Sequence, residues 1–163
     1  MKWSLIFLTV ILSFSRLNAT IFGIGVAFGV GAGADSFTGE IQLPIDFGGR
    51  FRLEPTLGYQ QSKGWQHSGN LGILSIGTGL YLMNDLADDI SIFYGGSFSY
   101  LDIDDDFPTA AHGSGFRIRP TVGLEYSFSE KFRMGADIGY SYSKLGEVEW
   151  QGIRSQALLK IFF

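Results

Sequence analysis

The feature that most constrains the fold is an alternation of apolar and polar residues that recurs from residue 21 to the end of the chain. Successive side chains of a β-strand point to opposite faces, so this period of two predicts strands with one apolar and one polar face. Eight such segments can be recognised, at about 21–33, 39–47, 51–60, 71–83, 89–101, 115–128, 132–144 and 152–163. The sequence therefore predicts an all-β chain of eight strands.

The connections between these segments alternate in length, with 34–38 as an exception. Residues 48–50, 84–88 and 129–131 form short links, whereas 61–70, 102–114 and 145–151 are longer. Short links require neighbouring strands to run antiparallel. Short turns at one end and longer loops at the other are typical of an up-and-down transmembrane β-barrel, whose strands cross the bilayer with about 9–11 residues.

The composition of the polar face distinguishes a membrane barrel from a soluble β protein. A soluble sheet buries its apolar face and presents its polar face to water. Here the polar face is mostly glycine, serine and threonine, and charged residues make up only 17% of the chain. We therefore expect the apolar face to contact lipid and the polar face to line a closed interior filled by side chains. The alternative is a soluble protein in which the apolar face forms the core.

The charges on the polar face nearly balance, which is expected if they share one closed interior. An unpaired charge there would be costly, and arginine, the main base, suits bidentate pairing with carboxylates. The acids are Glu40, Asp46, Glu54, Glu125 and Asp137, and the bases are Arg52, Arg117, Arg119, Arg133, Arg154 and Lys160. The sequence thus predicts a charge-paired interior without a wide pore.

The apolar face carries aromatic residues at two heights, as transmembrane barrels do at the two membrane interfaces. We expect a belt at the turn end formed by Phe47, Phe51, Tyr126, Phe128, Phe132 and Phe163, and a belt at the loop end formed by Tyr59, Phe98, Tyr100, Phe116, Tyr140, Tyr142 and Trp150. Pro44, Pro55 and Pro120 fall within predicted strands and lack backbone donors, so we expect β-bulges there.

Residues 1–19 have the layout of a secretory signal peptide. Lys2 precedes an apolar run over residues 3–12, and a more polar stretch ends at Ala19. This pattern predicts export and cleavage after Ala19, with a barrel domain over 20–163. The alternative is a retained N-terminal anchor helix. The chain has no cysteine, which excludes a disulfide framework and a thiolate metal site.

The chain resembles the OmpX-like and OmpA-transmembrane-domain-like eight-stranded barrels of Gram-negative bacteria. The features that carry this resemblance are the signal segment, the strand pattern and the final segment 157–163. Phe163 ends the chain, with apolar residues at every second position before it. This ending looks like the signal that the outer-membrane assembly machinery reads in that family. The resemblance implies a barrel in the cell outer membrane, with that machinery, outer-membrane lipid and lipopolysaccharide as partners, and no cofactor.

One pair of loop residues raises the possibility of catalysis. His112 and Ser114 are similar to the His-x-Ser pair that an outer-membrane lipid A deacylase uses with a glutamate. A nucleophilic serine needs its base and an orienting acid within hydrogen-bond reach. Glu125 points to the opposite face, however, and Gly115 stands where the deacylases have asparagine. We therefore expect His112 and the other histidine, His67, to be solvated loop residues and the protein not to be an enzyme.

The external loops are acidic, with seven acids against two bases. They are Asp35, Asp102, Asp104, Asp105, Asp106, Glu147 and Glu149 against Lys63 and Lys144. The Asp102–Asp106 cluster could hold Ca²⁺ or Mg²⁺, but it lacks the EF-hand spacing, so we expect a solvated acidic loop and no metal site. A negative outer tip would steer cationic partners.

These features predict a structural or surface-interaction barrel whose loops bind an external ligand. A narrow porin-like channel and a lipid A-modifying enzyme are the alternatives. The net charge of −4 gives no indication of nucleic-acid binding.

Overall fold

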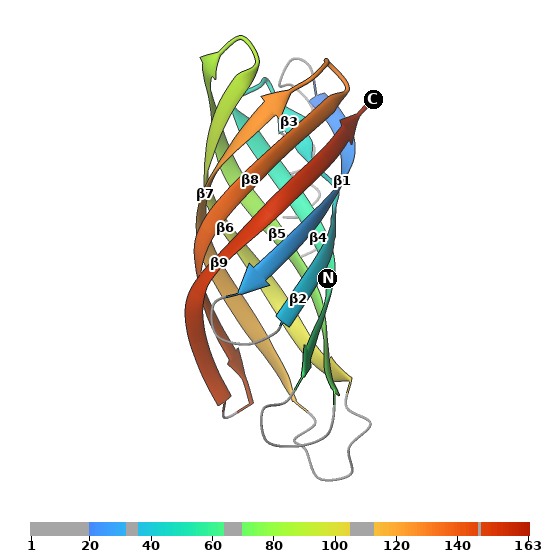
Figure 1. Cartoon of the computed structure of the whole chain (residues 1–163), viewed down its shortest axis with the longest axis vertical. Helices are drawn as coiled ribbons and strands as arrows, with labels where there is room; N and C mark the ends of the chain where they lie inside the picture. The colour runs from blue at the N-terminus through green and yellow to red at the C-terminus, as the bar shows by residue number, and fades with distance from the viewer. Residues whose placement is uncertain (1–19, 32–35, 64–69, 105–112, 147) are drawn as a thin grey trace, which may run out of the picture.

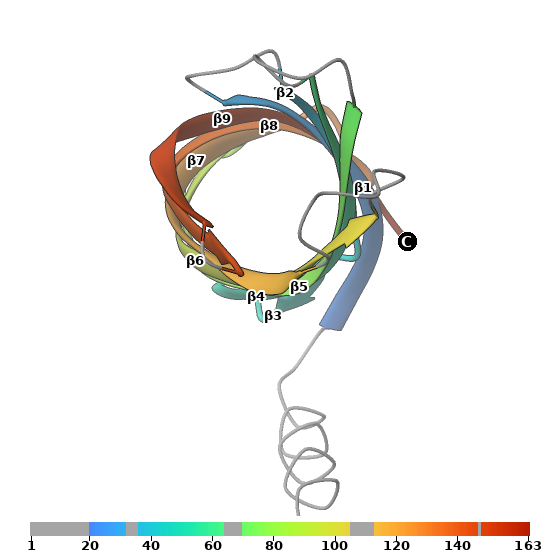
Figure 2. The same cartoon turned by 90° about the horizontal axis from the view of Figure 1, so that it is seen from below.

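The computed structural model describes residues 20–31, 36–63, 70–104, 113–146 and 148–163. These residues form a closed antiparallel β-barrel (Figures 1 and 2). Its strands are β1 (Thr20–Gly31), β2 (Ser36–Gln42), β3 (Ile45–Phe47), β4 (Phe51–Lys63), β5 (Asn70–Ala87), β6 (Ile90–Asp104), β7 (Ser114–Ser127), β8 (Phe132–Leu145) and β9 (Val148–Phe162). No helix in the described ranges is long and apolar enough to cross a membrane.

The barrel closes where its first strand meets its last. β1 pairs antiparallel with β9, from Gly23 opposite Phe162 to Gly31 opposite Arg154. β2 and β3 lie end to end between β1 and β4, so the nine described strands occupy eight positions in the wall. The predicted eight-stranded barrel is confirmed. We call the end with the links 48–50, 88–89 and 128–131 the turn end, and the opposite end the loop end.

Two prolines account for the break between β2 and β3. Pro44 stands in the break, and Pro55 lies opposite it in β4, where the Leu43 N–H donates to the Pro55 carbonyl at 2.9 Å. The Gly23 N–H donates to the Pro44 carbonyl, also at 2.9 Å, so β1 holds the broken segment in place.

The register is the same on both sides of this break, and it is also unchanged around Pro120 in β7. The prediction of β-bulges at the three prolines is therefore wrong for the described strands. A proline lacks only its own N–H, and omitting a ladder bond locally is enough to accommodate it. The register shift that the structure does show lies between Asp85 and Ala87, beside the β5–β6 turn.

The exposure of side chains confirms the predicted orientation of the two faces. Buried and exposed residues alternate along β7 and β8. Large apolar side chains point outward, with Phe22 51% and Ile76 60% exposed, whereas Arg52, Glu125 and Lys160 are at most 2% exposed. An outer surface so rich in exposed apolar side chains fits lipid and not water.

Aromatic side chains cluster on the outside near both ends. Ring centroids lie 6.0 Å apart for Phe47–Phe51, 4.8 Å for Tyr126–Phe128 and 5.5 Å for Phe128–Phe132 near the turn end, and 6.3 Å for Phe98–Phe116 and 6.1 Å for Phe116–Tyr142 near the loop end. The prediction that Trp150 belongs to the loop-end belt is wrong. Trp150 and Arg154 are an even number of positions apart in β9, so both side chains point to the interior, where Trp150 packs against buried residues.

The interior also contains apolar side chains that the polar-face argument did not predict. One cluster on the turn side consists of Ala27, Tyr81, Met83, Phe93 and Leu158, and one at the loop end consists of Ile73, Leu101 and Leu145 with Trp150 packed against them. Tyr81 and Phe93 meet edge to face at 5.5 Å. Gly123 makes room for this contact, since a β-carbon there would lie 2.2 Å from the Phe93 ring. Both clusters reduce the free cross-section of the barrel.

Candidate functional site in the barrel interior

The turn side of the interior contains a network of ion pairs that crosses the barrel. Arg52 on β4 donates to Asp46 on β3 at 2.5 Å and to Glu125 on β7 at 2.6 Å. Lys160 on β9 donates to Glu54 on β4 at 2.7 Å and to Glu125 at 2.8 Å. Glu125 therefore joins two bases that approach it from different strands, and the network links β3, β4, β7 and β9.

Arg133 on β8 completes this network at the turn end. Its Nη1 donates to Asp46 Oδ2 at 3.0 Å and lies 3.9 Å from Glu125 Oε2. Its guanidinium also lies over the Phe162 ring, 4.3 Å from the ring centroid. We call Asp46, Arg52, Glu54, Glu125, Arg133 and Lys160 the turn-side network. Its three acids and three bases are all in ion pairs, so the predicted charge pairing is confirmed here.

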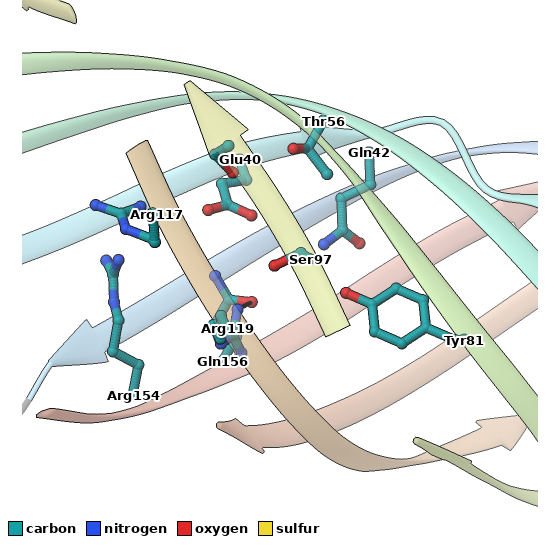
Figure 3. A pocket seen from close by; sticks show the side chains of 10 residues that line it. Glu40, Gln42, Thr56, Tyr81, Ser97, Arg117, Arg119, Arg154 and Gln156 are labelled. Atoms are coloured by element: carbon teal, nitrogen blue, oxygen red, sulfur yellow. Dashed lines mark hydrogen bonds between the residues drawn. The ribbon is translucent and has the colours of Figure 1, made fainter. Parts of the chain in front are cut away.

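Towards the loop end, the same interior contains a small polar cavity. Glu40, Gln42, Tyr81, Arg117, Arg119, Arg154 and Gln156 are among the residues that line it (Figure 3). Tyr81 belongs both to this lining and to the turn-side apolar cluster. We call this space the loop-side cavity.

Arg119 is held at the wall of the loop-side cavity. Its Nη2 donates to Asp137 on β8 in a close ion pair, and its Nη1 donates to Gln156 on β9 at 2.5 Å. Arg119 is 5% exposed and Asp137 is 8% exposed. The pairing predicted for the interior charges is therefore confirmed for these two residues as well.

Arg117 and Arg154 have a different environment. Arg117 donates to Ser143 Oγ at 3.2 Å and to Gln60 Oε1 at 3.1 Å. Arg154 donates to Thr38 Oγ1 at 2.9 Å and to the same Gln60 oxygen at 3.4 Å. Within the described ranges, neither guanidinium has a carboxylate within 4.0 Å. The prediction of a fully charge-paired interior is therefore wrong for these two arginines, because face parity does not place an acid beside each base.

The residues considered for lipid A chemistry are not brought together in the described part of the chain. Ser114 is exposed at the first position of β7. Glu125 lies near the other end of the same strand, 1% exposed and bound to Arg52 and Lys160. His67 and His112 lie outside the described residues.

The acidic loop is also largely outside the described residues. Asp102 is exposed near the end of β6, and the side chains of 104–106 are not described. The described residues contain no group of three or more His, Cys, Asp or Glu that could hold a metal ion. Part of the predicted negative charge at the loop end is paired, since Lys144 Nζ lies 2.9 Å from Glu149 Oε1.

The closed barrel, its apolar outer surface and its aromatic belts all indicate a membrane-spanning protein. In agreement, the family model of the outer membrane protein beta-barrel domain matches residues 8–158. The chain belongs to this family. It is an outer-membrane β-barrel protein of the Gram-negative type and resides in the cell outer membrane. No curated protein sequence matches this family member.

Solved structures show the same fold at low sequence identity. Neisserial surface protein A is 17% identical with a TM-score of 0.63, and the match covers 88% of this chain and 96% of that chain. The outer membrane enzyme PagL is 15% identical with a TM-score of 0.57 and coverages of 85% and 98%. The N-terminal β-barrel domain of Pseudomonas aeruginosa OprF is 14% identical with a TM-score of 0.56 and coverages of 88% and 97%. At these identities the likeness concerns the fold alone.

Proposed function

We propose that this barrel is a structural or surface-interaction protein of the outer membrane, which acts through its external loops and does not conduct solutes. The observation that carries the proposal is the turn-side network, whose side chains bridge the barrel from β3 and β4 to β7 and β9. Outer-membrane lipid and lipopolysaccharide would surround the apolar face, and an external ligand would meet the loops.

The turn-side network would oppose the passage of ions. Arg52 is 0% exposed, and Lys160 is 2% exposed between two carboxylates. An ion crossing at this level would have to separate buried pairs, and leaving one such charge unpaired costs several kcal/mol. Beside the network, Met83 and Phe93 fill space that water would otherwise occupy.

Planar bilayer recordings test this proposal. Protein extracted from outer membranes would be added to the bilayer, with a general porin as the positive control. We expect sparse or no steady conductance. A large, steady conductance in most insertions would overturn the proposal in favour of the narrow channel.

The C-terminal residue supports a proposed interaction with the assembly machinery. Phe163 is 74% exposed at the turn end, although its N–H donates to the Phe22 carbonyl at 3.0 Å. Its ring is therefore accessible beside a fixed backbone. Replacement by serine should slow the appearance of the heat-modifiable barrel in outer membranes, whereas the same change at Phe128, which is 55% exposed near the same end, should not.

A lipid-modifying enzyme is the second candidate, favoured by the similarity in fold to the enzyme PagL and by the exposure of Ser114. Mass spectrometry of lipid A from cells that express the protein tests it. We expect the same lipid A masses with the unaltered chain, with Ser114→Ala and with His112→Ala. A lipid A species that appears only with the unaltered chain would establish the enzyme.

A further inference from the structure

The charges of the interior are distributed unevenly along the barrel axis. The turn-side network balances three acids with three bases. Around the loop-side cavity, the acids Glu40 and Asp137 accompany the bases Arg117, Arg119 and Arg154. The cavity therefore has an excess of positive charge, carried by side chains that are buried inside the barrel wall.

Arg117 and Arg154 concentrate this excess at one place. Both donate to the same oxygen, Gln60 Oε1. Because their Nη2 atoms lie 3.1 Å and 3.4 Å from this oxygen, the two guanidinium groups are close to each other. The two side chains come from β7 and β9, and their guanidinium ends point toward the same part of the cavity (Figure 3). They are 4% and 8% exposed. Like charges held so close and so deeply buried repel each other unless an anion lies between them.

The cavity wall also has donors without acceptors. Arg119 Nε and Gln156 Nε2 are buried and have no hydrogen-bond partner among the described residues. A buried donor without an acceptor is unfavourable, and its presence needs an explanation. The cavity wall also has hydrogen-bond acceptors. Glu40 lines the cavity, and Gln42 Oε1 is buried without a partner among the described residues. The lining nevertheless contains three bases, Arg117, Arg119 and Arg154, against one acid, Glu40.

We propose that the loop-side cavity binds one small inorganic oxyanion of the phosphate or sulfate class, held between Arg117 and Arg154. A guanidinium presents its N–H groups as a planar fork that matches two oxygens of such an ion. Gln156 and Arg119 lie on the wall of the same cavity and would meet the ion directly or through one bridging water. This site goes beyond the proposed function, because it requires neither a ligand at the external loops nor passage through the barrel.

Equilibrium dialysis against radiolabelled inorganic phosphate tests the site. The protein would be extracted from outer membranes in a neutral detergent and dialysed at constant ionic strength, with chloride as the balancing anion. We expect saturable binding of one phosphate per barrel, with competition by sulfate. No saturable binding to the unaltered protein, or equal competition by chloride, would overturn the proposal without any variant.

Variants locate the site. Arg117→Gln and Arg154→Gln should each weaken phosphate binding by roughly tenfold or more, because each removes a hydrogen bond between charged groups. Arg154→Lys keeps the charge without the fork and serves if the glutamine variants do not fold. Glu40→Gln removes a like charge from a region of reduced dielectric and should tighten binding by roughly tenfold.

Lys144→Gln is the matched control, since Lys144 is a base on the outside of the loop end, half exposed and paired with Glu149. It should bind phosphate as the unaltered protein does. Loss of binding in Lys144→Gln, or unchanged binding in every folded Arg117 and Arg154 variant, would place the anion elsewhere and refute the proposed site.

Discussion

Replacing Glu125 by glutamine removes one charge from the centre of the turn-side network at almost constant volume. The Glu125 side chain is 1% exposed and accepts hydrogen bonds from Arg52 at 2.6 Å and from Lys160 at 2.8 Å. In Glu125→Gln, the amide oxygen can take the place of Oε1, which accepts both hydrogen bonds, while the amide nitrogen meets Arg133 Nη1, which lies 3.9 Å from Oε2. The network then contains three bases and two acids in a buried space.

The structure gives an expected magnitude for this change. Removing one partner of a buried ion pair destabilises a protein by about 3–5 kcal/mol. Arg52 keeps Asp46 at 2.5 Å and Lys160 keeps Glu54 at 2.7 Å, so we expect the lower end, about 3 kcal/mol. For a urea dependence of about 1–3 kcal/mol per molar, the unfolding midpoint should fall by roughly 1–3 M.

The assay is equilibrium urea unfolding of the barrel in detergent micelles, followed by tryptophan fluorescence and by gel mobility without boiling. Glu149→Gln is the matched control, because it removes a carboxylate from a pair with Lys144 in which both side chains are about half exposed. Water and salt screen such a pair, so its loss should leave the midpoint unchanged. The reasoning is refuted if Glu125→Gln unfolds at the same urea concentration as the unaltered protein, or if both variants lose equal stability.

Three further substitutions test the lipid-facing surface, the packing of the interior and a close contact between strands. Leu80→Arg places a charge on the lipid face near the middle of β5, where Leu80 is 49% exposed, and should reduce stability in lipid vesicles by about 2–4 kcal/mol; equal folding yields for both proteins would argue against lipid contact there. Phe93→Ala removes a buried ring that meets Tyr81 at 5.5 Å and should reduce the free energy of unfolding by about 3–5 kcal/mol, a loss that an unchanged melting temperature would rule out. Gly77→Ala adds a β-carbon 2.5 Å from the Phe98 carbonyl oxygen and should reduce stability by about 1–3 kcal/mol in urea; a variant as stable as the unaltered protein would show that the strands can separate locally.

Much of the barrel could be predicted from the alternation of residues along each strand, which assigns every side chain to one of two faces. Ile76 points to lipid and Arg52 to the interior because a strand places neighbours on opposite faces, and no tertiary information is needed for that assignment. The same rule places Trp150 inside, with Arg154, because an aromatic residue at the height of a belt belongs to that belt only if it also lies on the lipid face. The two apolar interior clusters could likewise have been found from parity, since Phe93 and Leu101 occupy positions opposite the lipid-facing residues of β6.

The sequence by itself determined that this chain forms an eight-stranded barrel with an apolar outside and a charged inside, because the period of two is a local property of each strand. Only the tertiary structure decided which charges meet. Arg52 and Glu125 are 73 residues apart, and their contact depends on the tilt and stagger of the strands around the closed barrel. The same stagger leaves Arg117 and Arg154 together on Gln60, without a carboxylate from the described strands.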